Sequence, residues 1–200
     1  MLQTESTRRD LMTALAAAAA AASIAGAARG QGKMTDSSDH SLSPPTGDVH
    51  DFDFLVGRWT ARNRYLKKRL AGSNDWIEFD GTLELWPILG GYGNVDDNVL
   101  KFPKRDVRAI SLRTFNAETR LWSIWWIQAS DATIDSPMHG GFRHGTGIFY
   151  GDNEIDGKPI KARFTWTPMT VNSARWVQAM SDDGGATWED NWFMDFTRVS

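Results

Sequence analysis

The stretch that decides the fold class is Trp188-Glu189-Asp190-Asn191-Trp192-Phe193-Met194-Asp195-Phe196-Thr197. Every second position from Trp188 to Phe196 shares one face, which is mostly apolar. The other face carries Glu189, Asn191, Asp195 and Thr197. A period of two is typical of a β-strand with one buried face. The stretch therefore predicts a strand that is rich in aromatic residues.

Nine more short runs have the same character, and no long helical period is found from Phe52 onward. They are rich in aromatic and β-branched residues, and turn-forming pairs such as Asp156-Gly157 separate them. The expected runs extend from Gly57 to Lys67, Trp76 to Trp86, Val95 to Phe102, Val107 to Phe115, Leu121 to Ser130, Gly141 to His144, Gly147 to Tyr150, Ile160 to Thr167, and Ala174 to Ser181. Together with the last run they predict about ten antiparallel strands.

An all-β domain with this many strands must dispose of two exposed sheet edges, and closing the sheet into a barrel removes both. We therefore expect residues 51–200 to form a single closed or nearly closed antiparallel barrel, with a two-sheet sandwich as the alternative. All ten tryptophans, ten phenylalanines and three tyrosines lie from Phe52 onward. In a small barrel such rings either fill the interior or line a cavity for a small ligand.

The amino terminus has the pattern of an export signal. Arg8 and Arg9 precede an alanine-rich apolar stretch, 11–28, which ends near the small-residue sequence Ala25-Gly26-Ala27. The arginine pair is typical of the twin-arginine route, which carries folded proteins. We therefore expect a signal peptide over residues 1–27, the twin-arginine export machinery as a partner, and a periplasmic or secreted protein without a stable membrane span after cleavage.

Three other interpretations of this terminus remain open: an uncleaved membrane anchor, an ordinary helix, and a start of translation at Met34. Residues 28–50 are mostly small and polar and contain Pro44-Pro45, so they predict a disordered linker. The net charge of −3 gives no basic field for nucleic acid, and a chain without cysteine has no disulfide or thiolate metal site. We expect no nucleic-acid partner.

Gly57-Arg58-Trp59 opens the first expected strand, and Arg198 ends the last. This arrangement resembles the lipocalins and the wider calycin group, and the resemblance implies a tryptophan that plugs one barrel end beneath an arginine. A cation over an indole face contributes roughly 0.5–2 kcal/mol.

The resemblance extends along the whole domain. The residues that carry it are His50 to Trp59, Gly81-Thr82-Leu83-Glu84, Ile88-Leu89-Gly90-Gly91, Ser173 to Gln178, and Asp183 to Glu189. In this order they are similar to a bacterial family catalogued as domain of unknown function 1579, which has a calycin-like, lipocalin-like barrel. The resemblance covers about Asp51 to Arg198 and implies the fold, but it implies no activity.

Several motifs suggest chemistry but fit structural roles better. Residues 181–188 match the Asp-box pattern, which describes a β-hairpin turn. Residues 152–157 begin like a calcium loop, but the position of the required glutamate is Arg163, so a hairpin with an Asp-Gly turn is expected. His139 and His144 could ligate a metal or haem iron, yet no third ligand is near in sequence, and surface positions are favoured. We expect no metal and no cofactor.

Polar residues embedded in aromatic strands are the remaining candidates for a site. A buried charge needs a partner or a ligand, so each of these residues either faces inward for a reason or lies on the wet face of its strand. The candidate ligand-binding residues are Glu84, Arg113, Trp126, Arg163, Trp166, Trp176, Gln178 and Asn191. The polar stretch from Asn94 to Asn98 is expected either as a rim over an open barrel end or as a solvated loop.

Three functions follow from these expectations. The first is a binding protein that holds a small apolar or aromatic molecule in an aromatic-lined cavity. The second is an isomerase or hydrolase in which a buried acid such as Glu84 acts as general acid or base, with catalytic residues otherwise unknown. The third is a filled barrel that meets another protein through a strand edge.

Overall fold

The computed structural model describes residues 42–130 and 132–199. The expected signal peptide, most of the expected linker and the alternative start at Met34 therefore lie outside the described residues.

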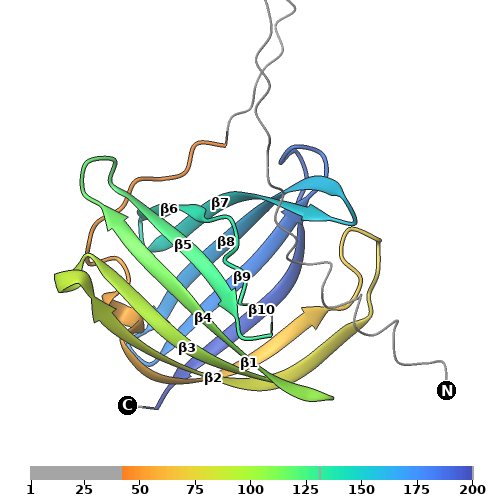
Figure 1. The fold of residues 1–200 in the computed structure, drawn as a ribbon, viewed down its shortest axis with the longest axis horizontal. Coiled ribbons are helices and arrows are strands. Elements are labelled where there is room, and N and C mark those ends of the chain that lie inside the picture. The colour runs from red at the N-terminus through yellow and green to blue at the C-terminus, as the bar shows by residue number, and fades with distance from the viewer. Residues whose placement is uncertain (1–41, 131, 200) are drawn as a thin grey trace, which may run out of the picture.

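Ten antiparallel strands form one closed barrel, in which each strand pairs with its sequence neighbours and β1 pairs with β10 (Figure 1). The strands are β1 (Gly57–Leu66), β2 (Trp76–Ile88), β3 (Gly93–Phe102), β4 (Arg105–Asn116), β5 (Leu121–Gln128), β6 (Met138–Arg143), β7 (Thr146–Ile155), β8 (Lys158–Thr170), β9 (Ser173–Ser181) and β10 (Glu189–Arg198). The expected all-β closed barrel is confirmed, and the sandwich alternative is wrong because no free edge separates two sheets within the described chain.

Period-two alternation explains most of the interior. Along β2, for example, Phe79, Leu83 and Leu85 are buried while the residues between them are exposed. β10 departs from this pattern because its pairing with β9 slips between Asp190 and Trp192. The extra residue in such a bulge turns part of the strand over. Asn191 is consequently fully buried, although the alternation placed it on the outward face.

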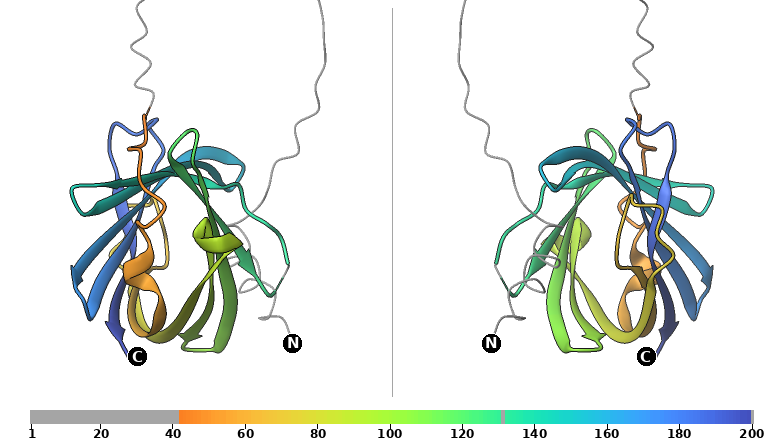
Figure 2. Two further views of the ribbon diagram at one scale, coloured as in Figure 1. Left: turned by 90° about the vertical axis from the view of Figure 1, so that its left-hand side faces the viewer. Right: turned by 90° about the vertical axis from the view of Figure 1, so that its right-hand side faces the viewer.

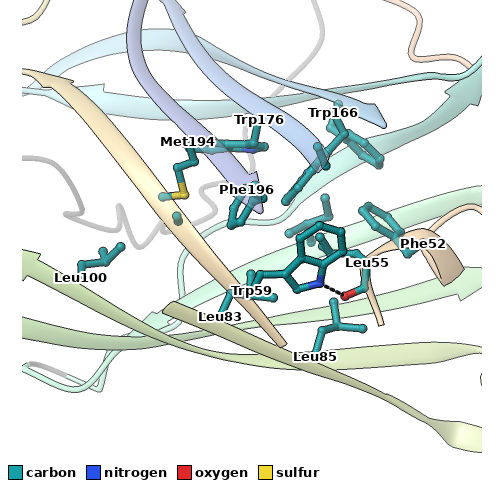
Figure 3. Close-up of a cluster of buried hydrophobic side chains, with 14 of the residues drawn as sticks. Phe52, Leu55, Trp59, Leu83, Leu85, Leu100, Trp166, Trp176, Met194 and Phe196 are labelled. Atoms are coloured by element: carbon teal, nitrogen blue, oxygen red, sulfur yellow. Dashed lines mark hydrogen bonds between the residues drawn. The ribbon is translucent and has the colours of Figure 1, made fainter. Parts of the chain in front are cut away.

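A short 3-10 helix, η1 (Asp53–Leu55), closes one end of the barrel (Figure 1). The indole Nε1 of Trp59 donates a hydrogen bond to the carbonyl oxygen of Leu55 (2.8 Å), which fixes the ring beneath the helix (Figure 3). The guanidinium carbon of Arg198 lies 4.1 Å from the centre of the Trp59 ring, and its Nη1 donates to the carbonyl of Val56. The tryptophan–arginine plug expected from the sequence is therefore present.

A second short helix, η2 (Leu89–Gly91), joins β2 to β3 at the same end, as Figure 2 shows in its left view. The loops at the opposite end are those between β1 and β2, β3 and β4, β5 and β6, β7 and β8, and β9 and β10. We call the η1 end the closed end and the other the open end.

Residues 42–50, which we call the strap, run along the outside of the barrel toward the closed end (Figure 1). The amide of Gly47 donates to the carbonyl of Arg120 (2.8 Å), and Arg120 Nη2 donates back to the carbonyl of Gly47 (2.8 Å). Trp122 Nε1 donates to the carbonyl of Asp48 (2.9 Å). Residues 42–50 are therefore held against the barrel and are not disordered as the sequence predicted for them.

Candidate ligand-binding cavity

The barrel interior contains a cavity of about 130 Å³ between the plug and the open end. Half-buried residues from the open end, among them Arg69, Phe102 and Gln128, form its mouth. A buried apolar cavity of about 150 Å³ is sufficient for benzene. The space therefore suits a ligand of about one aromatic ring, or a longer one that projects from the mouth.

One wall of the cavity is aromatic. Trp166 and Trp176 lie side by side on the paired strands β8 and β9, with ring centres 6.4 Å apart and ring planes inclined by 52°. Trp192 on β10 meets Trp176 edge to face at 5.6 Å. These rings are buried or half-buried and come from inward positions of their strands, as Figure 3 shows for Trp166 and Trp176. They offer broad apolar faces to a flat guest.

The opposite wall, on β3 and β4, contains a buried ion pair. Arg113 Nη2 lies 2.6 Å from Asp96 Oδ2, and the two side chains are 2 % and 0 % exposed. Arg113 Nη1 also donates to Asn94 Oδ1 (3.0 Å), and its guanidinium carbon lies 5.1 Å from the centre of the Phe52 ring. Because desolvation of two charges is costly, such a pair persists only where further hydrogen bonds support it.

Asp96 has that support. Its Oδ1 accepts a hydrogen bond from the backbone amide of Ser111 (2.7 Å) and another from Asn98 Nδ2. The register places Asp96 directly opposite Ser111 on the neighbouring strand. The two charges therefore offset each other, and Asp96 Oδ1 is held by two donors, but Asp96 Oδ2 and Arg113 Nε have no hydrogen-bond partner among the described residues. The same wall presents Asn98 and Ser111 to the cavity.

A second polar group enters from β9. Gln178 Nε2 donates to Asn191 Oδ1 (2.8 Å), and both residues are buried. Asn191 Nδ2 donates in turn to the carbonyl of Glu189 (3.3 Å). The bulge in β10 thus supplies the residue that orients Gln178 in the cavity wall.

The structure brings together five of the eight residues proposed from the sequence. Those that line the cavity are Arg113, Trp126, Trp166, Trp176 and Gln178. Asn191 is buried and orients Gln178.

Two of the residues predicted to bind the ligand, Glu84 and Arg163, face outward and do not line the cavity. Glu84 faces outward between the inward Leu83 and Leu85, and its Oε1 accepts from Arg58 Nε (3.0 Å) on the barrel surface. It therefore lacks the apolar surroundings that the enzymatic hypothesis required of it. Arg163 also faces outward, where its guanidinium carbon lies 4.6 Å from the centre of the Trp188 ring and its Nη2 3.7 Å from Asp190.

Sequence reasoning missed Asp96, Asn98 and Ser111. The stretch from Asn94 to Asn98 is neither a rim nor a loop but the first half of β3, with Asn94, Asp96 and Asn98 buried. Alternation alone points the other way, because Val95 and Val99 make the opposite face the more apolar one. The sign that remains is Leu100, which shares the face of Asn94, Asp96 and Asn98 and is buried.

The other motifs have structural roles. Asp183 accepts hydrogen bonds from the Thr187 amide and hydroxyl and from the Ser181 hydroxyl, as expected for an Asp-box turn. The Thr187 bonds hold the pKa of Asp183 well below its usual range. His139 and His144 are exposed, and His139 Nδ1 lies 3.0 Å from Ser123 Oγ. Asp156 and Gly157 both have positive φ, which confirms the expected hairpin turn.

Comparison with known proteins gives no family. No family model matches the chain, and no curated protein is significantly similar to it. Among solved structures, EF1p2_mFAP2b bound to DFHBI is 12 % identical, with a TM-score of 0.41 over 75 % of this chain and 98 % of that one.

A protein of unknown function from the DUF3598 family of Nostoc punctiforme is also 12 % identical, with a TM-score of 0.44 over 80 % of this chain. This chain spans 53 % of that protein's length. Likenesses of this degree carry no argument about function. Among the residues that the structure describes, no helix has the length and hydrophobicity needed to cross a membrane.

Proposed function

We propose that this protein is an exported barrel that binds a small, predominantly apolar or aromatic molecule in its interior. The observation that carries the proposal is the cavity of about 130 Å³ with tryptophan faces on one wall and hydrogen-bonding groups on the other. Ligand sites in proteins have this composition, in which apolar lining supplies affinity and a few polar groups fix orientation. The plug at the closed end leaves the open end as the route of entry.

The export component of the proposal rests on the sequence of residues 1–27, and so does the expected periplasmic or secreted location. The order of motifs from Asp51 to Arg198 supports membership of the calycin-like family noted above, as does the Trp59–Arg198 plug. A ligand loaded before translocation would be compatible with the twin-arginine route, since that route carries folded proteins.

The test of binding is a titration with toluene, followed through the indole N–H signals in the NMR spectrum of the labelled protein. We expect saturable shifts in a subset of these signals, because Trp126, Trp166, Trp176 and Trp192 line the cavity. Unchanged signals up to the solubility limit of toluene would refute the proposal.

A cavity-filling variant separates interior binding from adsorption on the surface. Ser111 faces the cavity, so Ser111→Phe places a phenyl ring in the space that the ligand needs. Leu112 is the next residue on β4 and faces outward, so Leu112→Phe is the matched control. We expect the first variant to lose toluene binding and the second to retain it, with both folded by circular dichroism.

A further inference from the structure

The amide of Gln178 is held in one orientation by a chain of donors. The backbone carbonyl of Glu189 can only accept, so Asn191 must direct its Nδ2 toward it. Asn191 Oδ1 is then the atom that faces Gln178, and it accepts from Gln178 Nε2. The carbonyl oxygen Oε1 of Gln178 remains. No hydrogen bond to it is found among residues 42–130 and 132–199, it does not belong to the fully buried side-chain atoms that lack a partner, and its residue lines the cavity.

The same reasoning fixes Asn98 on the far wall. Asp96 is paired with Arg113 and acts as an acceptor, so Asn98 must direct Nδ2 toward it. No hydrogen bond to the oxygen Oδ1 of Asn98 is found in the described part of the chain, and Asn98 lines the cavity. Strands β3 and β9 are separated by β2, β1 and β10 around the barrel, so the cavity has a carbonyl oxygen on each of two distant walls.

The charges of the buried wall do not favour an anionic guest. Arg113 is the cation of that wall. Its two Nη atoms are engaged by Asp96 and by Asn94, and its Nε has no hydrogen-bond partner among the described residues. Arg69, at the mouth, lies over the ring of Tyr65. A carboxylate that passed it to reach Gln178 and Asn98 would meet two amide oxygens and would have to compete with Asp96 for the Arg113 guanidinium. The free-energy cost of removing the guest's carboxylate from water would not be offset. Ser111 has a hydroxyl that serves as donor or acceptor, so it does not alter this preference.

We infer that the ligand is an uncharged aromatic molecule that donates a hydrogen bond from O–H or N–H, in the manner of a phenol or an indole. The inference rests on the proposed binding function and adds the chemical class of the ligand. The aromatic rings of β8, β9 and β10 hold the flat body of the guest. Gln178 Oε1 or Asn98 Oδ1 accepts its proton donor.

The experiment compares three single-ring probes by calorimetric titration of the full chain: phenol, anisole and benzoate. Phenol and anisole share a ring and an oxygen, but anisole has no donor. Benzoate is an acceptor-only anion. We expect phenol to bind about tenfold more tightly than anisole, because anisole leaves a desolvated carbonyl unpaired, and we expect benzoate to bind least.

Gln178→Met tests the residue that is assigned as an acceptor. This variant keeps an unbranched side chain of similar length but removes the amide oxygen, so the preference for phenol over anisole should fall. Val177 faces outward on the same strand, and Val177→Met is the control that should keep the preference. If Gln178→Met does not fold, the affinities of the unaltered protein for phenol, anisole and benzoate still test the ligand class.

The outcomes separate this inference from the function on which it rests. Equal affinities for phenol and anisole, or tightest binding of benzoate, would overturn the assigned ligand class and leave the binding function in place. Failure of toluene and all three probes to bind would overturn the binding function itself, and the ligand class with it. A phenol preference that survives in Gln178→Met and disappears in Asn98→Leu would assign the acceptor to β3 and would support the inference.

Discussion

Arg113 and Asp96 form an ion pair 2.6 Å long inside the barrel, with both side chains almost completely removed from solvent. They come from adjacent strands, and the guanidinium also lies 5.7 Å from the centre of the cavity-lining Trp166 ring. A filled apolar barrel would have no need of such a pair. We interpret it as the element that holds the β3–β4 wall, and therefore Asn98 and Ser111, in a fixed position beside the cavity.

Arg113→Met should destabilise the protein by about 3–5 kcal/mol, because it leaves the Asp96 carboxylate buried without its partner. The double variant Asp96→Asn with Arg113→Met removes both charges and keeps an oxygen for the Ser111 amide. We expect it to be no less stable than Arg113→Met alone, which would make the two effects strongly non-additive. Urea denaturation of the single and double variants measures this. Additive losses would show that the pair is not a unit.

Arg198→Met should destabilise the protein by about 2 kcal/mol. The change removes the contact with the Trp59 ring and the hydrogen bond to the carbonyl of Val56. Arg58 is the control, because its ion pair with Glu84 is exposed, and Arg58→Met should cost less than about 0.5 kcal/mol. Thermal unfolding of the two variants side by side checks the difference. Equal losses would argue against a structural role for the plug.

The ten strands and the plug could be predicted from the sequence because both depend on local signals: period-two alternation, turn residues, and a glycine–tryptophan pair at the head of the first strand. The direction of individual polar residues could not be predicted as well. Glu84, Arg113 and Arg163 each stand between less polar neighbours in a strand, yet only Arg113 faces inward. The difference lies in a partner on another strand, since Asn94 and Asp96 on β3 receive Arg113.

Asn191 shows a different limit. Its inward position depends on a one-residue shift in the register between β9 and β10. No turn residue or glycine in the sequence predicts this bulge. By contrast, the inward set Ala174, Trp176, Gln178 and Met180 followed from simple alternation and is confirmed. Inward apolar and aromatic residues were therefore predictable where the strand is regular. Polar residues were missed or misplaced in a bulge, in a polar inward run, and where a charged residue such as Glu84 or Arg163 lies on the outward face of a regular strand.

Stability should depend on pH through Asp183, whose pKa is lowered by the hydrogen bonds from Thr187. A carboxyl with a depressed folded-state pKa adds stability above its unfolded pKa of about 3.9, and the contribution is lost as the pH falls below that value. Asp183→Asn should therefore lower Tm at neutral pH, and the gap to the unaltered protein should narrow below about pH 4. Melting curves between pH 7 and pH 3 test this, with Asp182→Asn as the neighbouring control. A gap that is constant over the whole range would contradict it.

Gly141→Ala should release the strap from the barrel. An added Cβ at Gly141 would lie 2.5 Å from the Gly47 amide nitrogen and 2.8 Å from its Cα, which is closer than packed atoms allow. Because residues 42–50 are held mainly through Gly47 and Asp48, we expect faster thermolysin cleavage before Val49, with the barrel itself intact by circular dichroism. Arg143→Ala, an exposed change on the same strand, should leave the cleavage rate unaltered. Arg120→Ala removes the hydrogen bond to the Gly47 carbonyl and should accelerate cleavage as Gly141→Ala does. Unchanged cleavage rates in both Gly141→Ala and Arg120→Ala would show that these contacts do not hold the strap.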